Sequence, residues 1–466
     1  MDSEQRKNAV EQILLALPDL EWTLQAAKVK RLSRDFHWFS PVLKQQLENK
    51  QADAVVRPRN EEELSLLVKA CVQHNLPLIL RGGATGNYGQ LVPLQGGILA
   101  DMTAFNQVIE FGEGTVRAQT GIRLAEIESV TRPAGWELRC MPSTWRLATL
   151  GGLYGGGFGG IGSINYGPLG APGNVLSVKV MTMEAEPRIL TVPAPQALLL
   201  HHAYGSNGIV LEVELALAPV HQWIERLDVF DDFTDALDYA NAFARSPGLV
   251  KRQLALFAAP IPSYFSHLNG NYQATQHAVI SVIAAQSEGL CAGLLTKHRG
   301  QGAIRQTADE AREANSSLME YCWNHTTLHA LKVDSTLTYL QTAFNYSTYR
   351  QQIIAMAELF GEEVISHIEF LRDNDGNVTA SGLQLIRYST EERLNEIMQI
   401  FRDHDVKINN PHVFTIEEGK QGEIKAGVVS VKNSLDPAGL LNPGKLQGWE
   451  VRNTLTLQSD PLSLRK

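Results

Sequence analysis

The 466-residue chain has few cysteines, no long apolar run and no cluster of basic residues. Its four cysteines (Cys71, Cys140, Cys291 and Cys322) are far apart and form no CxxC pair. We therefore expect free thiols in a reducing compartment, not disulfides or a zinc site. No segment approaches the roughly 20 apolar residues of a membrane span, and the N-terminus has no signal-peptide core. These absences predict a cytoplasmic protein without a membrane span.

Acidic residues outnumber basic residues, and the formal net charge is −9. A nucleic acid is itself a polyanion, so this charge argues against it as a partner. No basic run is present that would hold the chain on an anionic membrane surface. The length is sufficient for two or three domains with a large core.

Glycine, in contrast, is concentrated in two segments. The first, residues 81–89 (RGGATGNYG), holds four glycines in nine residues and follows the apolar run at residues 76–80. Glycines directly after a buried strand allow several backbone N–H groups to point at one spot, as a diphosphate requires. Arg81 adds a cationic group beside them. A plain turn between two strands is the alternative interpretation of this loop.

The second segment, residues 151–173, contains eleven glycines in 23 residues, interspersed with Leu, Ile, Phe and Tyr. This density predicts neither a helix nor a strand interior, and the apolar residues argue against a flexible linker. We expect backbone lying against a flat, extended ligand. Residues 155–160 also satisfy the GxGxxG spacing of dinucleotide-binding folds, but Pro168, Pro172 and further glycines exclude the helix which that motif requires.

Strand and helix patterns alternate along the chain. Residues 1–50 are predicted to be mostly helical, with Phe36, Trp38 and Phe39 docking this segment onto the domain that begins near residue 51. In that domain, periodicity predicts helices near residues 61–75 and 124–131 and strands near residues 77–80, 98–100, 107–110, 115–118, 174–183 and 209–217. From about residue 220 the pattern changes to two similar units of strands and helices. An Asp-Gly pair at 375–376 marks a hairpin between strands 363–372 and 378–387.

Six pieces of the chain together resemble the FAD-binding domain of the vanillyl-alcohol oxidase and p-cresol methylhydroxylase (PCMH-type) family. The resemblance runs from about residue 55 to 219, with a closing signature near the C-terminus. Its pieces are residues 56–64, 81–89, 120–121, 142–144, 149–152 and 205–210, and the signature is residues 435–445 (LDPAGLLNPGK). The order and spacing of the pieces carry the resemblance.

The resemblance implies an α+β fold: a two-part PCMH-type FAD-binding domain and an α/β cap, or substrate, domain with an antiparallel sheet. The corresponding boundaries are 1–50 for the N-terminal helical segment, 51–219 for the FAD-binding domain, 220–410 for the cap and 411–466 for a segment that returns to the flavin. FAD is the implied cofactor. Some relatives attach it covalently through a histidine in the first loop, where this chain has Gly83 and Ala84, so a non-covalent flavin is expected.

The residues that would contact FAD are also implied by the resemblance. The first loop would hold the diphosphate, the second segment would line the flavin and ribityl chain, Ile209 would lie at the adenine or ribose end, and the C-terminal signature would reach the isoalloxazine. The residues concerned are Arg81, Gly82, Gly83, Ala84, Thr85, Gly86, Asn87, Gly89, Gln90, Pro142, Ser143, Thr144, Thr149, Gly151, Gly152, Gly156, Ile209, Asn442 and Lys445.

A candidate acid–base pair lies in the strand pattern at residues 364–370. Alternation puts His367 and Glu369 on one face of that strand. We expect this face to be turned toward the flavin, where His367 would accept a substrate proton and Glu369 would orient the ring. An ordinary polar strand surface is the alternative.

His412, with Glu417 and Glu418 nearby, is a second catalytic candidate. Relatives that act on 2-hydroxy acids carry a Glu-His pair near this position and a separate His-rich segment, which together help to bind a metal. This chain lacks the His-rich segment, so no metal site is predicted. Arg372 and Arg387 are further candidates for binding a substrate carboxylate.

The resemblance therefore predicts an FAD-dependent oxidoreductase that removes a hydride from a small hydroxylated substrate. A 2-hydroxy acid such as lactate or glycolate is the first expectation. The alternatives are an alcohol, a sugar or a phenol on the same scaffold, or a flavin-binding protein without catalysis. The partner that re-oxidises the flavin is not identified.

Overall fold

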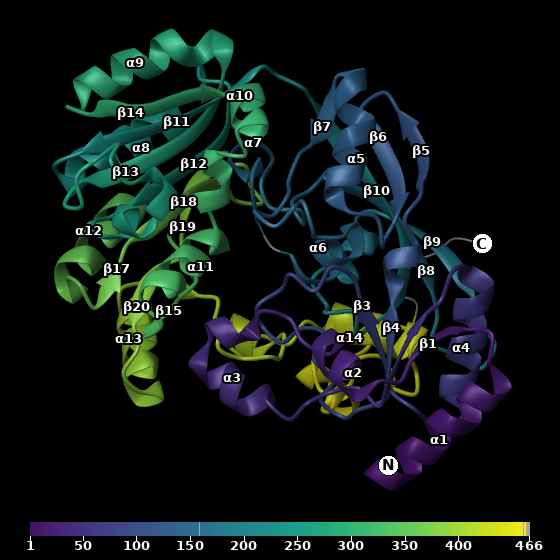
Figure 1. Cartoon of the computed structure of the whole chain (residues 1–466). Helices are drawn as coiled ribbons and strands as arrows, with labels where there is room; N and C mark the ends of the chain where they lie inside the picture. The colour runs from purple at the N-terminus through teal and green to yellow at the C-terminus, as the bar shows by residue number, and fades with distance from the viewer. Residues whose placement is uncertain (158, 460, 463–466) are drawn as a thin grey trace.

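The computed structural model describes residues 1–157, 159–459 and 461–462, and its strands form four sheets. Two sheets belong to the N-terminal half and two to the segment after Pro219. Figure 1 shows the long sheet of the second half on one side and the N-terminal sheets on the other. Within the described residues, no helix is both long and apolar enough to cross a membrane. Phe158, in the second glycine-rich segment, lies outside the described residues.

The first sheet has the order β1-β2-β4-β3, from β1 (Glu21–Thr23), β2 (Ala54–Arg57), β3 (Leu78–Arg81) and β4 (Ile98–Asp101). Both β2 and β3 run parallel to β4. Helices α1 (Ser3–Ala16) and α4 (Glu61–Gln73) share one hydrophobic cluster with its strands. Asn60 caps α4 by accepting from the Glu63 N–H group, and three glutamates occupy the first turn, where the helix dipole favours them.

The second sheet is built around the eleven-residue strand β10 (Ile209–Pro219). Its order is β5-β6-β10-β8-β9, and β7 (Trp136–Leu138) pairs with the far end of β10. The other strands are β5 (Val108–Gly112), β6 (Thr115–Gln119), β8 (Val175–Met181) and β9 (Ile189–Pro193). All pairs are antiparallel. Helices α5 (Leu124–Thr131), α6 (Leu150–Gly156) and α7 (Ser163–Tyr166) belong to the same part of the chain.

The cap contains an antiparallel sheet of eight strands. In spatial order these are β14 (Gln301–Thr307), β11 (Trp223–Phe230), β13 (His277–Ala284), β12 (Lys251–Phe257), β18 (His367–Arg372), β19 (Val378–Gly382), β16 (Thr342–Ala343) and β21 (Lys407–Ile408). A smaller sheet joins β15 (Leu337–Tyr339), β20 (Leu385–Arg387) and β17 (Val364–Ile365). The predicted α+β fold, with a two-part N-terminal domain and an antiparallel cap sheet, is confirmed. The domain boundaries at residues 50, 219 and 410 stay predictions.

One face of the cap sheet shares a hydrophobic cluster with α8 (Phe233–Arg245), α9 (Glu288–Lys297), α12 (Tyr349–Phe360) and α13 (Glu391–Asp403). Helix α11 (Asn324–Val333) packs on the opposite face, in a second cluster with Leu227 and Phe257. Helix α10 (Ala308–Glu313) contacts β11 and β14. Helix α8 contacts β11, β12 and β13, and α7 of the N-terminal half contacts β12 and β18. Every residue of β11 and β12 is buried. The cap sheet is thus an internal layer of the molecule, and α7 ties it to the N-terminal half.

The N-terminal segment contacts the first half, where we expected it to dock, and the cap as well. It contains α2 (Ala26–Leu32) and α3 (Pro41–Leu47). The Phe36 N–H group donates to the Gly86 carbonyl at 2.7 Å. On the other side, Phe39 packs edge-on against Tyr339 of the cap, and its carbonyl accepts from the Thr338 hydroxyl at 2.8 Å.

The C-terminal segment returns to the first sheet, as Figure 1 shows in yellow. Leu441 bridges Leu78 in parallel, so the chain after α14 (Ala426–Leu435) continues the sheet beyond β3. The buried Lys432 ammonium donates to Asp436 at 2.6 Å and to the Ser206 carbonyl at 2.6 Å. Because Asp436 also accepts from the N–H groups of residues 440 and 441, this ion pair fixes the path of the returning chain.

Three local predictions were wrong. Residues 150–156 form a helix, α6, although we expected no helix in the second glycine-rich segment. The helix forms because Thr149 caps it and because Leu150, Leu153 and Tyr154 are buried along one side. Strand β14 was not predicted at all, since its residues are mostly half-exposed and polar. The expected single strand at 378–387 is broken into β19 and β20, which join different sheets.

One buried charge network holds the cap against the N-terminal half. Glu137 of β7 accepts from the indole N–H group of Trp223 at 3.0 Å. It also pairs with Arg132 at 2.8 Å and with Arg252 at 3.2 Å. Burial raises the pKa of Glu137, and Arg252 is the main group that opposes the shift. Trp223 and Arg252 come from β11 and β12, so this carboxylate links the two halves.

We therefore expect Glu137→Ala to lower the free energy of unfolding by about 3 to 5 kcal/mol, because Arg252 would lose a buried partner. Urea unfolding measures the change. Glu110→Ala is the matched control, since that carboxylate pairs with Arg117 on the surface and its loss is expected to change stability by less than about 1 kcal/mol. Equal effects of the two substitutions would contradict the assignment.

Candidate functional site: a cavity between the glycine-rich loops and the cap

The first glycine-rich loop begins where β3 ends. Arg81 donates from Nε to the Leu32 carbonyl at 3.0 Å and from Nη1 to the Gly82 carbonyl at 2.8 Å. Its guanidinium also lies 3.9 Å from Asp101. Ala84 has φ 55°, a left-handed conformation that turns neighbouring N–H groups to the same side. Within the described part of the chain, no acceptor exists for the backbone N–H groups of Ala84, Thr85, Gly86 and Asn87.

The second glycine-rich segment lies directly against this loop. Thr149 Oγ1 accepts from the N–H groups of Gly152, at 3.2 Å, and Gly83, at 3.4 Å. A Cβ atom on Gly82 would stand 2.1 Å from Thr149 Oγ1, and one on Gly83 would stand 2.3 Å from the Leu147 carbonyl oxygen. Glycine is therefore required at both positions for the two backbones to approach.

Two side-chain hydrogen bonds complete this junction. The Thr144 hydroxyl donates to the Thr85 hydroxyl at 3.2 Å, and the Gln90 amide donates to the Gly156 carbonyl at 2.9 Å. The two segments, about 60 residues apart in sequence, thus form one continuous wall.

A cavity lies along this wall, and most of the residues expected to contact FAD line it. They are Arg81, Gly82, Gly83, Ala84, Thr85, Gly86, Asn87, Gln90, Pro142, Ser143, Thr144, Thr149, Gly151, Gly152 and Gly156. Thr120, Tyr204, Gly205, Asn207, Gly208 and Val210 line it as well. The sequence signal for this last group was present, since residues 120–121 and 205–210 are pieces of the resemblance, but only Ile209 was chosen there.

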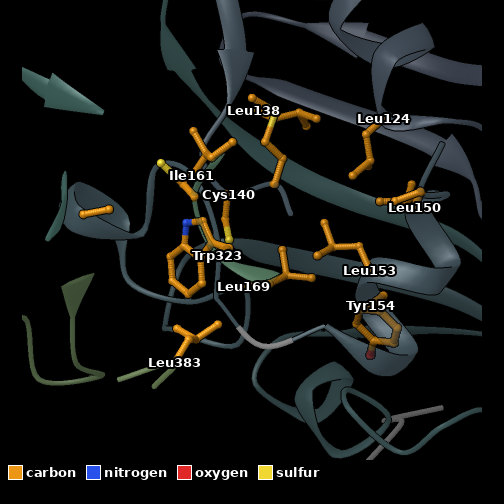
Figure 2. Close-up of a cluster of buried hydrophobic side chains, with 14 of the residues drawn as sticks. Leu124, Leu138, Cys140, Leu150, Leu153, Tyr154, Ile161, Leu169, Trp323 and Leu383 are labelled. Atoms are coloured by element: carbon orange, nitrogen blue, oxygen red, sulfur yellow. The ribbon is translucent and has the colours of Figure 1, made fainter. Parts of the chain in front are cut away.

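The opposite wall comes from the cap. Its lining residues are Trp323, Asn324, Gln341, Ser381, Leu383 and Asn409. In Figure 2, Trp323 and Leu383 lie beside Cys140, Ile161 and Leu169 of the N-terminal half, within one buried cluster. Sequence reasoning missed all of these cap residues, because each is an isolated position in a different strand, helix or loop and belongs to no motif.

Tyr88 and Tyr204 line the cavity, and Tyr339 lies at the Tyr88 hydroxyl. Burial raises the pKa of Tyr88 to about 12, against the opposing influence of Gln341, Asn324 and Tyr339 around its hydroxyl. Burial likewise raises the pKa of Tyr204 and of Tyr339, and in both cases Tyr88 and Asp35 add to the shift. These phenols are therefore neutral near pH 7 and can donate hydrogen bonds.

Four of the expected cofactor contacts do not line the cavity. Gly89 and Ile209 lie next to lining residues. Asn442 donates to the Gln90 carbonyl at 2.8 Å and to the Tyr204 carbonyl at 2.7 Å, and Lys445 donates to the Gly89 carbonyl at 2.7 Å. Burial lowers the pKa of Lys445 to about 7. The C-terminal signature thus supports the first loop through these hydrogen bonds, from positions outside the cavity lining.

His367 and Glu369 do share one face of β18, as expected, but neither lines the cavity. Both are fully buried, and His367 Nε2 lies 2.9 Å from a Glu369 oxygen. Glu369 also accepts from the Trp323 backbone N–H group at 2.6 Å. Trp323 has φ 54°, so the carboxylate holds a strained lining residue in place. The pair thus lies behind Trp323, which itself lines the cavity. The catalytic role of the pair stays a prediction.

His412 does not line the cavity either. Its Nδ1 lies 2.8 Å from the Ser40 hydroxyl and its Nε2 lies 2.8 Å from the Tyr339 carbonyl oxygen. A carbonyl can only accept, so Nε2 carries a proton, and the Ser40 hydroxyl can donate to Nδ1 of a neutral ring. Burial lowers the pKa of His412 to about 4. Nearby, Glu417 accepts from the N–H groups of Gln447 and Gly448. Both side chains thus support the path of the C-terminal segment.

Arg372 and Arg387, the further candidates for a substrate carboxylate, lie elsewhere too. Arg372 donates to the Gly376 carbonyl within the hairpin, and Arg387 lies 3.4 Å from Asp334. In the described ranges, no three His, Cys, Asp or Glu side chains gather closely enough to share a metal ion.

Comparisons with known proteins agree with this geometry. Residues 52–191 match the model of a family described as an FAD binding domain. The chain is 30% identical over 117 residues to the glycolate oxidase subunit GlcD of Bacillus subtilis, which covers 25% of either chain. It is 28% identical over 210 residues to the mitochondrial D-lactate dehydrogenase (cytochrome) of Arabidopsis thaliana, over 43% of this chain and 36% of that one. The matches thus span about a quarter to a third of these curated relatives.

A solved structure of alkyldihydroxyacetonephosphate synthase has the same fold. It superposes with a TM-score of 0.68 over 94% of this chain and 86% of the other, at 16% identity. These matches agree with the resemblance: residues 52–191 form an FAD binding domain, and the chain has the fold of the synthase. FAD is the cofactor of this domain. The unpaired N–H groups of residues 84–87 and the close glycine junction fit its diphosphate.

The glycine junction generates a prediction about cofactor affinity. Gly83→Ala places a methyl group against the Leu147 carbonyl and forces the two segments apart. We expect FAD to bind about 5- to 150-fold more weakly, as overpacking of about 1 to 3 kcal/mol implies. Equilibrium dialysis measures this affinity. Gly293→Ala is the control, because a Cβ atom there meets nothing within 4 Å. Unchanged affinity of Gly83→Ala would refute the junction's role.

The buried neutral ring of His412 generates a prediction about pH. The folded-state pKa near 4 lies below the ordinary 6.5, so the unfolded chain binds more protons between these values. Stability is lost as the pH falls through this window. Relative to His412→Gln, wild type should lose about 2 kcal/mol of unfolding free energy from about pH 7 to about pH 5.

Urea unfolding of both FAD-saturated proteins at the two pH values measures this difference. His267→Gln, at an exposed histidine, should follow wild type. A pH-independent gap between wild type and His412→Gln would show that the ring titrates normally.

Proposed function

We propose that this protein is an FAD-dependent oxidoreductase that oxidises a small hydroxylated substrate. The observation that carries the proposal is the cavity itself. Its first wall has four backbone N–H groups without acceptors among the described residues, and its second wall, from the cap, presents the polar side chains of Asn324, Gln341, Ser381 and Asn409. One wall suits a diphosphate-bearing cofactor, and the other suits a molecule with hydroxyl groups.

Each part of the chain has a separate task in this proposal. The residue 82–87 loop holds the diphosphate, and the residue 142–157 segment supports the planar part of the cofactor. Bound FAD supplies an acceptor for the hydride that leaves the substrate carbon. The cap wall orients the substrate, and buried Leu383 and Trp323 exclude water from it.

The names of two relatives, glycolate oxidase and D-lactate dehydrogenase, support 2-hydroxy acids as one substrate class. Neutral alcohols and sugars are the second class, which is favoured by a specific observation. The described cap residues that line the cavity are all uncharged, so this wall offers no cation to a carboxylate. The partner that re-oxidises FAD is a separate molecule that we do not name.

We also propose that FAD is held without a covalent bond. Among the described residues that line the cavity there is neither a histidine nor a cysteine, so the wall offers no imidazole or thiol for attachment of the flavin. The loop positions in question are Gly83 and Ala84.

The test is made on the purified protein loaded with FAD. We expect a yellow protein whose colour passes into the supernatant on acid precipitation. Anaerobic addition of hydroxy acids, alcohols and sugars, one at a time, should bleach the visible band with at least one of them. A protein that takes up no FAD, or a bound flavin that none of them reduces, would refute the proposed oxidation.

A further inference from the structure

The cavity is lined by only two charged side chains in the described part of the chain, Asp35 and Arg81. The Arg81 guanidinium already donates hydrogen bonds to the carbonyls of Leu32 and Gly82, and it lies near Asp101. Asp35 comes from the N-terminal segment, outside every piece of the family resemblance. Its presence in the cavity is therefore a property of this chain's own N-terminal segment.

One oxygen of Asp35 is held firmly. Oδ1 accepts from the His37 backbone N–H group at 3.0 Å and lies 2.9 Å from His37 Nδ1. The next residue, Phe36, is fixed to the Gly86 carbonyl. These contacts lock both the backbone and the orientation of the carboxylate beside the first loop.

The other oxygen has nothing to bind. Oδ2 is buried, and no donor for it exists among the described residues. The whole side chain has no exposed surface. An ideal Cβ atom on Gly86 would lie 3.8 Å from Oδ2, which places this oxygen at the loop that lines the cavity. A buried carboxylate oxygen without a donor is unfavourable unless a ligand supplies one.

The surroundings decide what kind of ligand this can be. The groups whose pKa responds to Asp35 are the phenols of Tyr204 and Tyr339 and the ammonium of Lys445. Lys445 does not line the cavity, and its ammonium donates to the Gly89 carbonyl. A carboxylate entering the cavity would thus meet a negative charge and, among the described lining residues, no uncommitted cation. A hydroxyl group would meet an acceptor.

We propose that Asp35 Oδ2 accepts a hydrogen bond from a hydroxyl group of the substrate, and that the substrate is an uncharged alcohol, polyol or sugar. This inference rests on the function proposed above and narrows its substrate class. The amides of Asn324, Gln341 and Asn409 on the facing wall can bind further hydroxyl groups, as donors and acceptors. Asp35 is the specificity-determining residue, since its charge disfavours the 2-hydroxy acids.

The substrate class is tested with pairs of compounds that differ only in a CH2OH or a COO− group. Suitable pairs are propane-1,2-diol with lactate, glycerol with glycerate, and sorbitol with gluconate. Anaerobic bleaching of the FAD-loaded protein is followed for both members. The neutral member of at least one pair should bleach the flavin at least tenfold faster than its acid. Faster bleaching by the acids would overturn this inference while leaving the proposed oxidation standing.

A second measurement needs no turnover. Acetate and propionate are titrated into the FAD-loaded protein, and binding is read from the change in the visible flavin band. Asp35→Asn keeps the shape of the side chain and removes its charge, so these anions should bind the variant at least tenfold more tightly than wild type. Asp309→Asn, at an exposed carboxylate, should behave as wild type. Equal binding to wild type and Asp35→Asn would overturn the role of Asp35.

A hydroxyl group of the FAD ribityl chain is the other possible donor to Oδ2, and cofactor affinity separates the two. If the substrate is the donor, Asp35→Asn should bind FAD within about twofold of wild type by equilibrium dialysis. A tenfold loss of FAD affinity in this variant, with the control unchanged, would assign Oδ2 to the cofactor and overturn the proposal. If no compound bleaches the flavin, the proposed oxidation fails, and the anion titration still decides whether the charge of Asp35 controls the cavity.

Discussion

The structure depends on the approach of two backbones at Thr149. Its hydroxyl accepts from Gly83 of the first loop and from Gly152 of the second segment, and only glycine leaves enough room at positions 82 and 83. A single side chain thus caps α6 and joins the two segments. The N–H groups of residues 84–87 are left without partners among the described residues. A cofactor that accepts hydrogen bonds can pair with these N–H groups. The backbone conformation that forms the wall therefore also forms the binding site.

Three separate parts of the chain close the cavity around this wall. The cap is held by the buried Glu137 network, the C-terminal segment by Lys432 and Asp436, and the N-terminal segment by Phe36 and Phe39. The Glu137 and Lys432 links are buried, so both are strengthened by the low local dielectric and sensitive to loss of one partner. His412, expected to act in catalysis, forms a further link, because it contacts Ser40 of the N-terminal segment and the Tyr339 carbonyl of the cap. His367 and Glu369 pair with each other inside the cap, where Glu369 holds the Trp323 backbone.

Electrostatics distinguish this cavity from one suited to an anionic substrate. Its phenols are neutral, its cap wall carries amides and a hydroxyl, and its uncommitted charge is negative. The relatives named for hydroxy acids match this chain over 117 and 210 residues, at 30% and 28% identity. In the proposed arrangement the N-terminal domain holds the cofactor and the cap faces the substrate, so a shared cofactor is compatible with a different substrate.

The sequence by itself determined the α+β architecture and the two glycine-rich segments, since strand and helix periodicity and glycine density are local signals. Most of the residues expected on the cofactor wall were implied by the family resemblance, which rests on the order and spacing of short motifs. The sequence also placed His367 and Glu369 on one face of β18. Only the tertiary structure decided which way that face points, that residues 150–156 are helical, and that Asp35, Trp323, Gln341 and Asn409 meet at one cavity. These residues lie far apart in the chain and share no periodicity. Their proximity arises from packing between sheets, which no local pattern encodes.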